Sequence, residues 1–205
     1  GGELNQIIKD KSKIKARFAF CFPDSYEIGM SNLGIRILYG VLNNIEDVWC
    51  ERVYAPWEDM EAEMRKNDIP LWAVESGDKL LDFDFVGFTL QYELCYSNVL
   101  NMLDLAKIPL LSKDRDDSMP IVIGGGPCSY NAEPIADFFD MFYIGEGETQ
   151  YRKLLDVYKA CRKAGKSRQE FLYEASKVPG MYVPSMYDVQ YKEDGTIASF
   201  TPVKE

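Results

Sequence analysis

The 205-residue chain contains no histidine. Without an imidazole it cannot form a Ser-His-Asp triad, a histidine-based zinc site or an imidazole general base, so many common enzyme classes are excluded. Its five cysteines are odd in number, scattered and without a C-x-x-C pair, unlike a disulfide framework or a metal-binding cluster. We expect reduced, mostly buried thiols, and no metal ligand or catalytic residue in this chain.

Long apolar runs and a basic surface are absent too. No run approaches the roughly 20 residues that span a bilayer, and the N-terminus lacks the charged and apolar blocks of a signal peptide. We therefore expect a cytoplasmic protein without membrane contact. With 23 basic and 33 acidic side chains, the net charge of −10 repels polyanions, so we expect no nucleic-acid partner through a general basic surface.

The residues that are present predict a globular α/β protein. Apolar residues make up 46% and charged residues 27% of the chain, which is the usual globular range. Short apolar runs alternate with helical patterns, as in βαβ units on a parallel sheet. We predict a doubly wound parallel sheet of five strands. The strands are expected at 16–22, 48–54, 85–90, 121–123 and 141–144, with a short edge strand at 71–74.

Apolar side chains at helical spacing predict crossover helices at 33–42 and 99–106, and a charge gradient favours a solvent-facing helix at 57–66. A long helix at 148–164 is expected to end at Gly165, and Ser167 to Glu170 match a capping box that opens another.

Asp194-Gly195 favours a turn between 187–191 and 197–200, which predicts a β-hairpin at the end of the chain. The expected divisions are a lead-in at 1–14, an α/β domain at 15–165, and a helix and hairpin extension at 166–205.

Candidate ligand-binding residues follow from the predicted sheet. In an open parallel sheet, ligands bind where loops leave the carboxyl ends of the strands, and three marked loops fall there, at 23–29, 89–93 and 124–127. Glycines in such loops remove the Cβ atom, so a flat macrocycle or a nucleotide tail can approach the backbone. The candidate cleft residues are Asp24, Tyr26, Gly29, Thr89, Gly124, Gly125 and Gly126.

Structural roles compete at each of these positions. The triple glycine also suits a strained turn, Asp24 suits a loop cap and Tyr26 suits packing. The glycine spacing is not that of a dinucleotide site, and 145–148 suits a tight turn before an acidic helix start. If Phe22, Tyr26 and Tyr92 fill the cleft, the domain would instead be a structural one whose acidic surface contacts a partner.

Two known kinds of module with this sheet fit less well. A flavin-binding module needs a Ser/Thr/Gly-rich loop after its first strand, and 23–29 supplies little of that chemistry. A phosphoacceptor receiver domain needs an aspartate after its third strand and a lysine near its fifth, where this chain has Thr89 and Gly145. A stand-alone ligand-binding or protein-docking module without catalysis stays as the alternative function.

Three motifs together carry a family resemblance. Asp24 to Gly29 have the spacing of the cobalamin-binding signature D-x-H-x-x-G, with Tyr26 at the histidine position. With Gly124 to Pro127 and Tyr143 to Glu148, this segment resembles the N-terminal cobalamin-binding-like domain of radical SAM iron–sulfur proteins. The resemblance covers about residues 15–150, and the stretches at 91–98 and 178–184 look like one branch of that family.

The resemblance implies a cobalamin-binding-like, flavodoxin-like Rossmannoid fold. Family members place a C-x-x-x-C-x-x-C motif after such a domain, where three thiolates hold a 4Fe-4S cluster that binds S-adenosylmethionine. This chain lacks that motif. We therefore expect an accessory N-terminal fragment whose partner is its own downstream radical SAM barrel, towards which 166–205 leads.

Cobalamin is the candidate ligand that the resemblance implies for this domain. In the family the histidine of the signature coordinates cobalt, and the glycine lets the chain pass close to the corrin. Tyr26 is a poor substitute for that histidine, because a phenol stays protonated near neutral pH. Members that hold cobalamin without a protein ligand to cobalt leave binding by this chain open.

Overall fold

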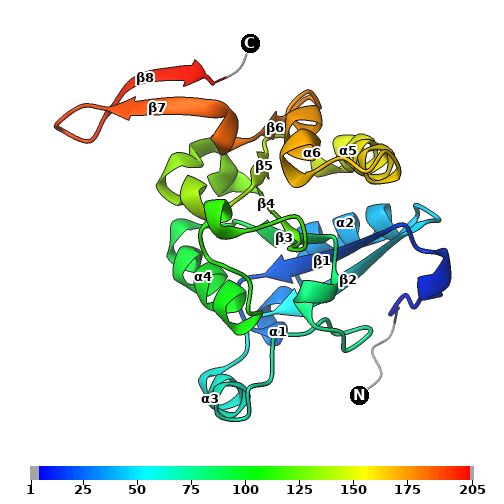
Figure 1. Ribbon diagram of the computed structural model, residues 1–205. Coiled ribbons are helices and arrows are strands. Elements are labelled where there is room, and N and C mark those ends of the chain that lie inside the picture. Colours follow the sequence, from blue (N-terminus) through cyan, green and yellow to red (C-terminus); the bar gives the residue numbers. More distant parts are fainter. Residues whose placement is uncertain (1–4, 204–205) are drawn as a thin grey trace.

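The computed structural model describes residues 5–203 (Figure 1). Residues 1–4 of the predicted lead-in and residues 204–205 of the predicted extension lie outside the described part. The lead-in that is described lies against strand β2 (Val48–Tyr54). There the Trp49 indole donates to the Ile7 carbonyl at 3.0 Å, and Lys9 Nζ donates to the carbonyls of Asn43, Ile45 and Val48.

Six strands form the main sheet in the order β2-β1-β3-β4-β5-β6. The first five run parallel, and β6 pairs antiparallel with β5. The five predicted parallel strands are all present, but the predicted count of five is wrong because β6 adds a sixth. The bounds are β1 (Ala16–Phe22), β2 (Val48–Tyr54), β3 (Phe85–Thr89), β4 (Ile121–Gly125), β5 (Met141–Tyr143) and β6 (Met181–Tyr182).

The predicted edge strand at 71–74 is also wrong. The segment bends back on itself, since the Ala73 amide donates to the Asp78 carbonyl and Gly77, with φ 74°, donates to the Ala73 carbonyl. Trp72 forms only an isolated bridge with Lys79. A tight turn closed by these local bonds therefore replaces the strand.

Helices cover both faces of the sheet, so the sheet is doubly wound (Figure 1). One face carries α2 (Leu33–Asn43), α5 (Gly147–Lys163) and α6 (Arg168–Ala175), whose buried side chains pack on Phe18, Phe20 and Phe85. The other carries α3 (Glu58–Lys66) and α4 (Tyr96–Leu105). Successive residues of a strand point to opposite faces, which explains why nearly all of β1 is buried.

Shorter helical turns complete the connections. The four-residue α1 (Tyr26–Gly29) follows β1, so Tyr26 lies in a helical turn. The 3-10 turns are η1 (Lys11–Lys13), η2 (Leu80–Asp82), η3 (Glu93–Cys95), η4 (Ser112–Asp114), η5 (Pro127–Asn131), η6 (Glu133–Phe138) and η7 (Pro184–Met186).

The predicted helix ends are confirmed around α5 and α6. Gly165 adopts φ 67° after α5, and the Lys166 amide returns to the Cys161 carbonyl at 3.0 Å. The capping box that opens α6 is complete, because Ser167 accepts the Glu170 amide and Glu170 accepts the Ser167 amide.

A two-stranded hairpin of β7 (Tyr187–Tyr191) and β8 (Ile197–Pro202) projects from the body, in orange and red in Figure 1. Cross-strand pairs place Tyr187, Val189 and Phe200 on one face and Asp188 and Gln190, with their partners, on the other. The Phe200 ring lies 4.6 Å from that of Tyr187. The hairpin is thus an amphipathic arm.

The five thiols are free and buried, as predicted. Burial raises the pKa of each one, because a thiolate is poorly solvated inside the protein. All five contribute to the buried interior of the domain.

Candidate functional site

The loop after β1 is held by contacts to neighbouring loops. Asp24 accepts the Ser25 amide at 2.7 Å and the Tyr92 hydroxyl at 3.1 Å. Burial and the Asp24 carboxylate raise the pKa of Tyr92. The Asn98 side chain donates to the Pro23 carbonyl at 2.9 Å. Asp24 therefore joins the loops after β1 and β3.

Aromatic rings occupy the space beside this loop. Tyr26 packs edge-on against Tyr54, with ring centroids 5.2 Å apart and planes at 81°. A Cβ atom added to Gly29 would lie 2.6 Å from the Tyr54 ring and 2.8 Å from the Phe22 ring. The space that is free because Gly29 has no Cβ atom is thus filled by the protein's own side chains. Of the three aromatic residues expected to fill the cleft, Phe22 lies beside Gly29 and Tyr26 lies against Tyr54, whereas Tyr92 stays 43% exposed.

The loops after β3 and β4 are bound to each other through their backbones. The Leu90 amide donates to the Gly125 carbonyl at 2.6 Å, and the Cys128 amide donates to the Leu90 carbonyl at 3.0 Å. Gly126 has φ 97°, and a Cβ atom there would lie 3.0 Å from the Leu90 carbonyl oxygen. Only glycine suits this backbone crossing, so Gly126 has a structural role in the contact between the two loops.

Gly124 and Gly125 belong to β4 rather than to the turn, and they differ in the space beside them. A Cβ atom on Gly124 would lie 2.7 Å from the Phe142 ring and 3.1 Å from Leu90. A Cβ atom on Gly125 would make ordinary contacts, at 3.6 Å to the Tyr151 hydroxyl and 3.9 Å to the Tyr143 carbonyl oxygen. The space beside Gly124 is therefore filled by the Phe142 and Leu90 side chains, whereas Gly125 borders an open space.

The open space is a cavity of about 180 Å³ at the carboxyl ends of β3, β4 and β5. Three predicted residues, Thr89, Gly125 and Gly126, line it, whereas Asp24, Tyr26, Gly29 and Gly124 do not. The Thr89 hydroxyl is already bonded by the Gln91 amide. Ligand pockets usually enclose about 300–1,000 Å³, so this space is smaller than a typical cofactor site.

Sequence reasoning missed three residues that shape this region. Gln91, Tyr143 and Tyr151 line the cavity, and the Tyr143 hydroxyl donates to the Glu146 carbonyl at 2.8 Å. Tyr151 lies four residues after Gly147 on α5, so helical spacing from the glycine-rich turn could have indicated it. Tyr54 had no such signal, because its contact with Gly29 is long-range.

A pair of alanine variants tests this geometry. Gly124→Ala is expected to lower the free energy of unfolding by about 1–3 kcal/mol, because its methyl group overpacks the Phe142 ring. Gly125→Ala, its neighbour on the opposite face, is expected to stay within about 0.5 kcal/mol of the parent sequence. Urea unfolding followed by circular dichroism measures both, and equal costs would contradict the difference between the two sides.

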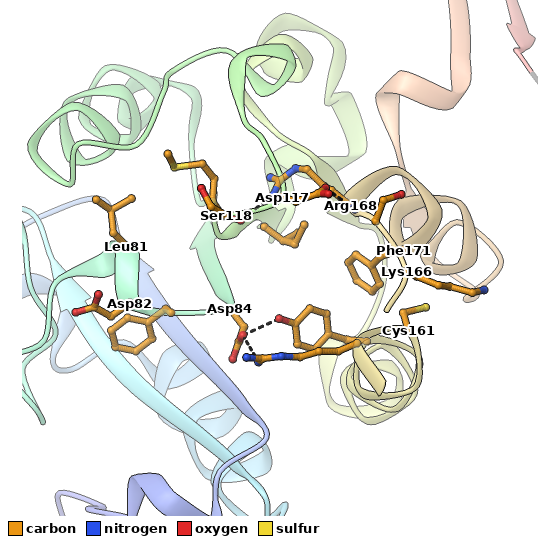
Figure 2. A pocket seen from close by; sticks show the side chains of 15 residues that line it. Leu81, Asp82, Asp84, Asp117, Ser118, Cys161, Lys166, Arg168 and Phe171 are labelled. Carbon is orange, nitrogen blue, oxygen red and sulfur yellow. Dashed lines mark hydrogen bonds and ion pairs between the residues drawn. The ribbon is translucent and has the colours of Figure 1, made fainter. Parts of the chain in front are cut away.

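A second cavity, of about 360 Å³, lies at the opposite edge of the sheet (Figure 2). Asp84, directly before β3, accepts the Tyr158 hydroxyl at 2.6 Å and Arg162 at 2.7 Å. Burial raises the pKa of the Tyr158 hydroxyl, and the neighbouring Asp84 carboxylate raises it further. Lys166 pairs with Glu174 at 2.9 Å. These charged groups thus already have partners within the chain. The cavity that they line lies between α5, α6 and the sheet.

Arg168, on the far wall of this cavity, belongs to a buried ion cluster. Asp140 Oδ2 accepts from Arg168 at 2.7 Å, from Arg115 at 3.0 Å and from the Val122 amide at 2.7 Å. Both arginines also donate to backbone carbonyls. The cluster therefore joins α6 and the loop before β4 to the sheet.

Within residues 5–203, no group of three or more cysteine, aspartate or glutamate side chains is placed to hold a metal ion. Over the same residues, every helix is too short or too polar to cross a bilayer.

The comparisons with known proteins bear on most of the chain. A family model described as radical SAM proteins, N-terminal, matches residues 34–184. That range contains the stretch at 178–184 and begins after Asp24 to Gly29, the segment with the cobalamin-type spacing. The uncharacterized protein MJ0966 of Methanocaldococcus jannaschii is 28% identical over 138 residues, which are 66% of this chain and 25% of that protein.

Two solved structures of the radical S-adenosylmethionine methyltransferase TsrM from Kitasatospora setae are also similar, each at 13% identity. One, with tryptophan substrate and a SAM analog bound, has a TM-score of 0.47 and covers 93% of this chain and 30% of its own. The other, with cobalamin and a [4Fe-4S] cluster bound, has a TM-score of 0.46 and covers 92% and 29%.

The present chain thus spans about a quarter of the curated relative that it matches. The predicted family is confirmed: with a family match over residues 34–184, the chain belongs to the N-terminal domain family of radical SAM proteins.

Proposed function

We propose that this chain is the accessory N-terminal domain of a radical SAM iron–sulfur enzyme. In this proposal it has a cobalamin-binding-like fold but holds no cobalamin. The absence of cobalamin is supported by the surroundings of Gly29. The Tyr54 and Phe22 rings fill the place where a corrin would approach. The chain's part in the reaction is then structural, and the chemistry belongs to the cluster and S-adenosylmethionine of the following domain.

The residues present do not fit a corrin on three counts. The chain has no histidine to coordinate cobalt, and Tyr26 packs its ring against Tyr54. The cavity near Gly125 encloses only about 180 Å³. The loops after β1 and β3 are also joined to each other by the hydrogen bond from the Tyr92 hydroxyl to Asp24.

Titration with hydroxocobalamin tests the absence of binding. We expect no shift of the corrin absorption bands with the unaltered chain, and no pigment that co-purifies with it. We expect none with Tyr26→His either, because Tyr54 still fills the space beside Gly29. A shift with Tyr26→His alone would show that only the ligand was missing, and a shift with the unaltered chain would overturn the proposal.

The enzymatic part of the proposal has its own test. The gene is expected to encode three cysteines at C-x-x-x-C-x-x-C spacing beyond residue 205, and the purified parent protein is expected to contain a 4Fe-4S cluster and to cleave S-adenosylmethionine. A parent protein without those cysteines would leave a docking module without radical chemistry.

A further inference from the structure

Basic side chains gather where the lead-in of the chain meets α5. Residues 9–15 carry four lysines, and residues 152–163 of α5 carry five lysines and arginines. The same two segments hold only two of the 33 acidic side chains, Asp10 and Asp156. On a protein with a net charge of −10, this is a basic surface of local extent.

Both segments line one groove, beside the starts of β1 and β2. One hollow, of about 690 Å³, is lined by Lys13 of the lead-in and Arg152 of α5. A second hollow, of about 620 Å³, reaches Lys163 at the end of α5. Four residues line both hollows, namely Ile14, Lys15, Asp47 and Lys159. The two hollows therefore adjoin, and we call them together the amino-edge groove.

The amino-edge groove carries a net positive charge. Seven lysines and arginines line its two hollows, against four acids. The acids are Asp10, Glu46, Asp47 and Asp156. Asp47 is held by Lys15 at 3.3 Å and by Lys159 at 3.0 Å. An anion that enters the groove therefore meets more attraction than repulsion.

Three exposed cations of the groove have no partner of opposite charge within residues 5–203. They are Lys13, Arg152 and Lys163. Lys9 differs from them, because its Nζ donates to three backbone carbonyls and is part of the fold. The three unpaired cations can thus bind an external anion without breaking an ion pair inside the protein.

The groove cations that belong to α5 lie in a row. Arg152, Lys159 and Lys163 are seven and four residues apart, so they share one face of the helix. At a rise of about 1.5 Å per residue, the row is about 16 Å long. A single small anion meets only part of this row, whereas an extended polyanion meets all of it.

The lining of the groove favours an acidic peptide over a strand of nucleic acid. Single-stranded nucleic acids stack their bases on aromatic rings, and no aromatic side chain is among the described residues that line the groove. Aliphatic contacts come from Ile14, Ile45 and Ala160 instead. An extended peptide rises about 3.3 Å per residue, so about five residues span the row and carboxylates at alternate positions face it.

We infer that the amino-edge groove binds an extended acidic segment of a partner protein. Alternate carboxylates of that segment pair with Lys13, Arg152 and Lys163, and its backbone lies over Ile14. The acidic remainder of the surface repels such a segment, which confines it to the groove. The inference does not depend on the proposed function, because the groove lies beside the starts of the strands, away from the loops after β1, β3 and β4.

Fluorescence anisotropy with the intact protein tests the inference. The probe is a fluorescein-labelled peptide of alternating glutamate and alanine, about ten residues long and so longer than the row. We expect it to bind, and to be released in about 1 M salt, where the screening length is about 3 Å. The matching peptide of glutamine and alanine is expected not to bind. No change of anisotropy up to about 0.1 mM protein would overturn the inference.

Two double variants locate the binding site of the peptide. Lys13→Glu with Lys163→Glu reverses two unpaired charges of the groove and is expected to weaken binding about tenfold. Lys113→Glu with Lys192→Glu makes the same change of net charge at exposed lysines elsewhere, and is expected to weaken binding less than about twofold. Equal weakening by both variants would show attraction to the protein as a whole and would contradict a site in the groove.

Two further measurements distinguish the other occupants. A uridine oligonucleotide that binds in the groove more tightly than the glutamate peptide would replace the acidic segment by nucleic acid. Sedimentation velocity without peptide reports self-association of the protein. Oligomers that are lost only in the groove variant would assign the groove to a second copy of this chain, and the inference would then be wrong.

Discussion

Replacing Asp140 by alanine is expected to lower the free energy of unfolding by about 3–5 kcal/mol, because it leaves two buried arginines without their counter-ion. The side chains of Arg115 and Arg168 are 0% and 6% exposed, so water cannot replace the lost carboxylate. Burial already lowers the pKa of Arg115, and Asp140 is the group that opposes this shift. A domain of ordinary stability, about 5–15 kcal/mol, would lose a large share of it.

The physical reason lies in how many elements meet at one oxygen. Asp140 Oδ2 accepts from α6 through Arg168, from the loop before β4 through Arg115, and from the Val122 amide of β4. Removing it also leaves the Val122 amide without this acceptor, and an unsatisfied buried donor costs about 1–3 kcal/mol by itself.

Urea unfolding followed by tryptophan fluorescence measures the effect. Asp188→Ala, on the exposed polar face of the arm, is the matched control and is expected to change the free energy by no more than about 0.5 kcal/mol. If Asp140→Ala cost no more than this control, the arginines would have to be stable without a counter-ion, and the structural role assigned to the cluster would be wrong.

The sequence predicted those parts of the fold that depend on neighbouring residues. The buried strand Ala16–Phe22 is apolar except for Arg17, and the capping box at Ser167 is a local pattern with a local cause. It did not predict β6, since Met181–Tyr182 is two residues long and has no period of its own. The short apolar run at 71–74 wrongly predicted an edge strand. The backbone hydrogen bond from Ala73 to Asp78 forms a turn there instead.

The same distinction between local patterns and long-range contacts applies to the candidate site. The sequence indicated which loops meet at the carboxyl edge, because parallel strands place them there. It could not separate Gly124 from Gly125, since the difference depends on Phe142 filling one face of β4. Nor could it show that Tyr54, on the neighbouring strand β2, takes the space beside Gly29. Contacts of this kind between distant residues decide whether a glycine serves packing or a ligand.

Replacing Phe85 by alanine is the second change with a large expected effect. Phe85 is fully buried at the start of β3, and its ring contacts three aromatic neighbours. It stacks on Phe18 at 5.6 Å and meets Tyr158 of α5 at 4.7 Å and Phe171 of α6 at 6.0 Å, both edge-on. Truncation of a buried phenylalanine costs about 3–5 kcal/mol, so we expect a loss of that size.

The position of the Phe85 ring determines which elements lose stability in Phe85→Ala. Phe85 lies between the sheet and α5 and α6, next to Tyr158, whose hydroxyl holds Asp84 at the same edge. A cavity at this point weakens the attachment of α6, which leads into β6 and the arm. Hydrogen exchange of α6 and β6 is therefore expected to rise more than that of β2, which pairs with β1 and not with β3.

Two controls separate this effect from a general loss of apolar area. Phe85→Leu keeps most of the volume and is expected to cost no more than about 1.5 kcal/mol. Phe200→Ala removes the same ring from the arm, where the residue is 44% exposed, and is expected to cost clearly less than Phe85→Ala. Equal costs for Phe85→Ala and Phe200→Ala would contradict a core centred on Phe85. If protection were lost evenly over the whole sheet, the ring would not be the specific link between the extension and the parallel strands.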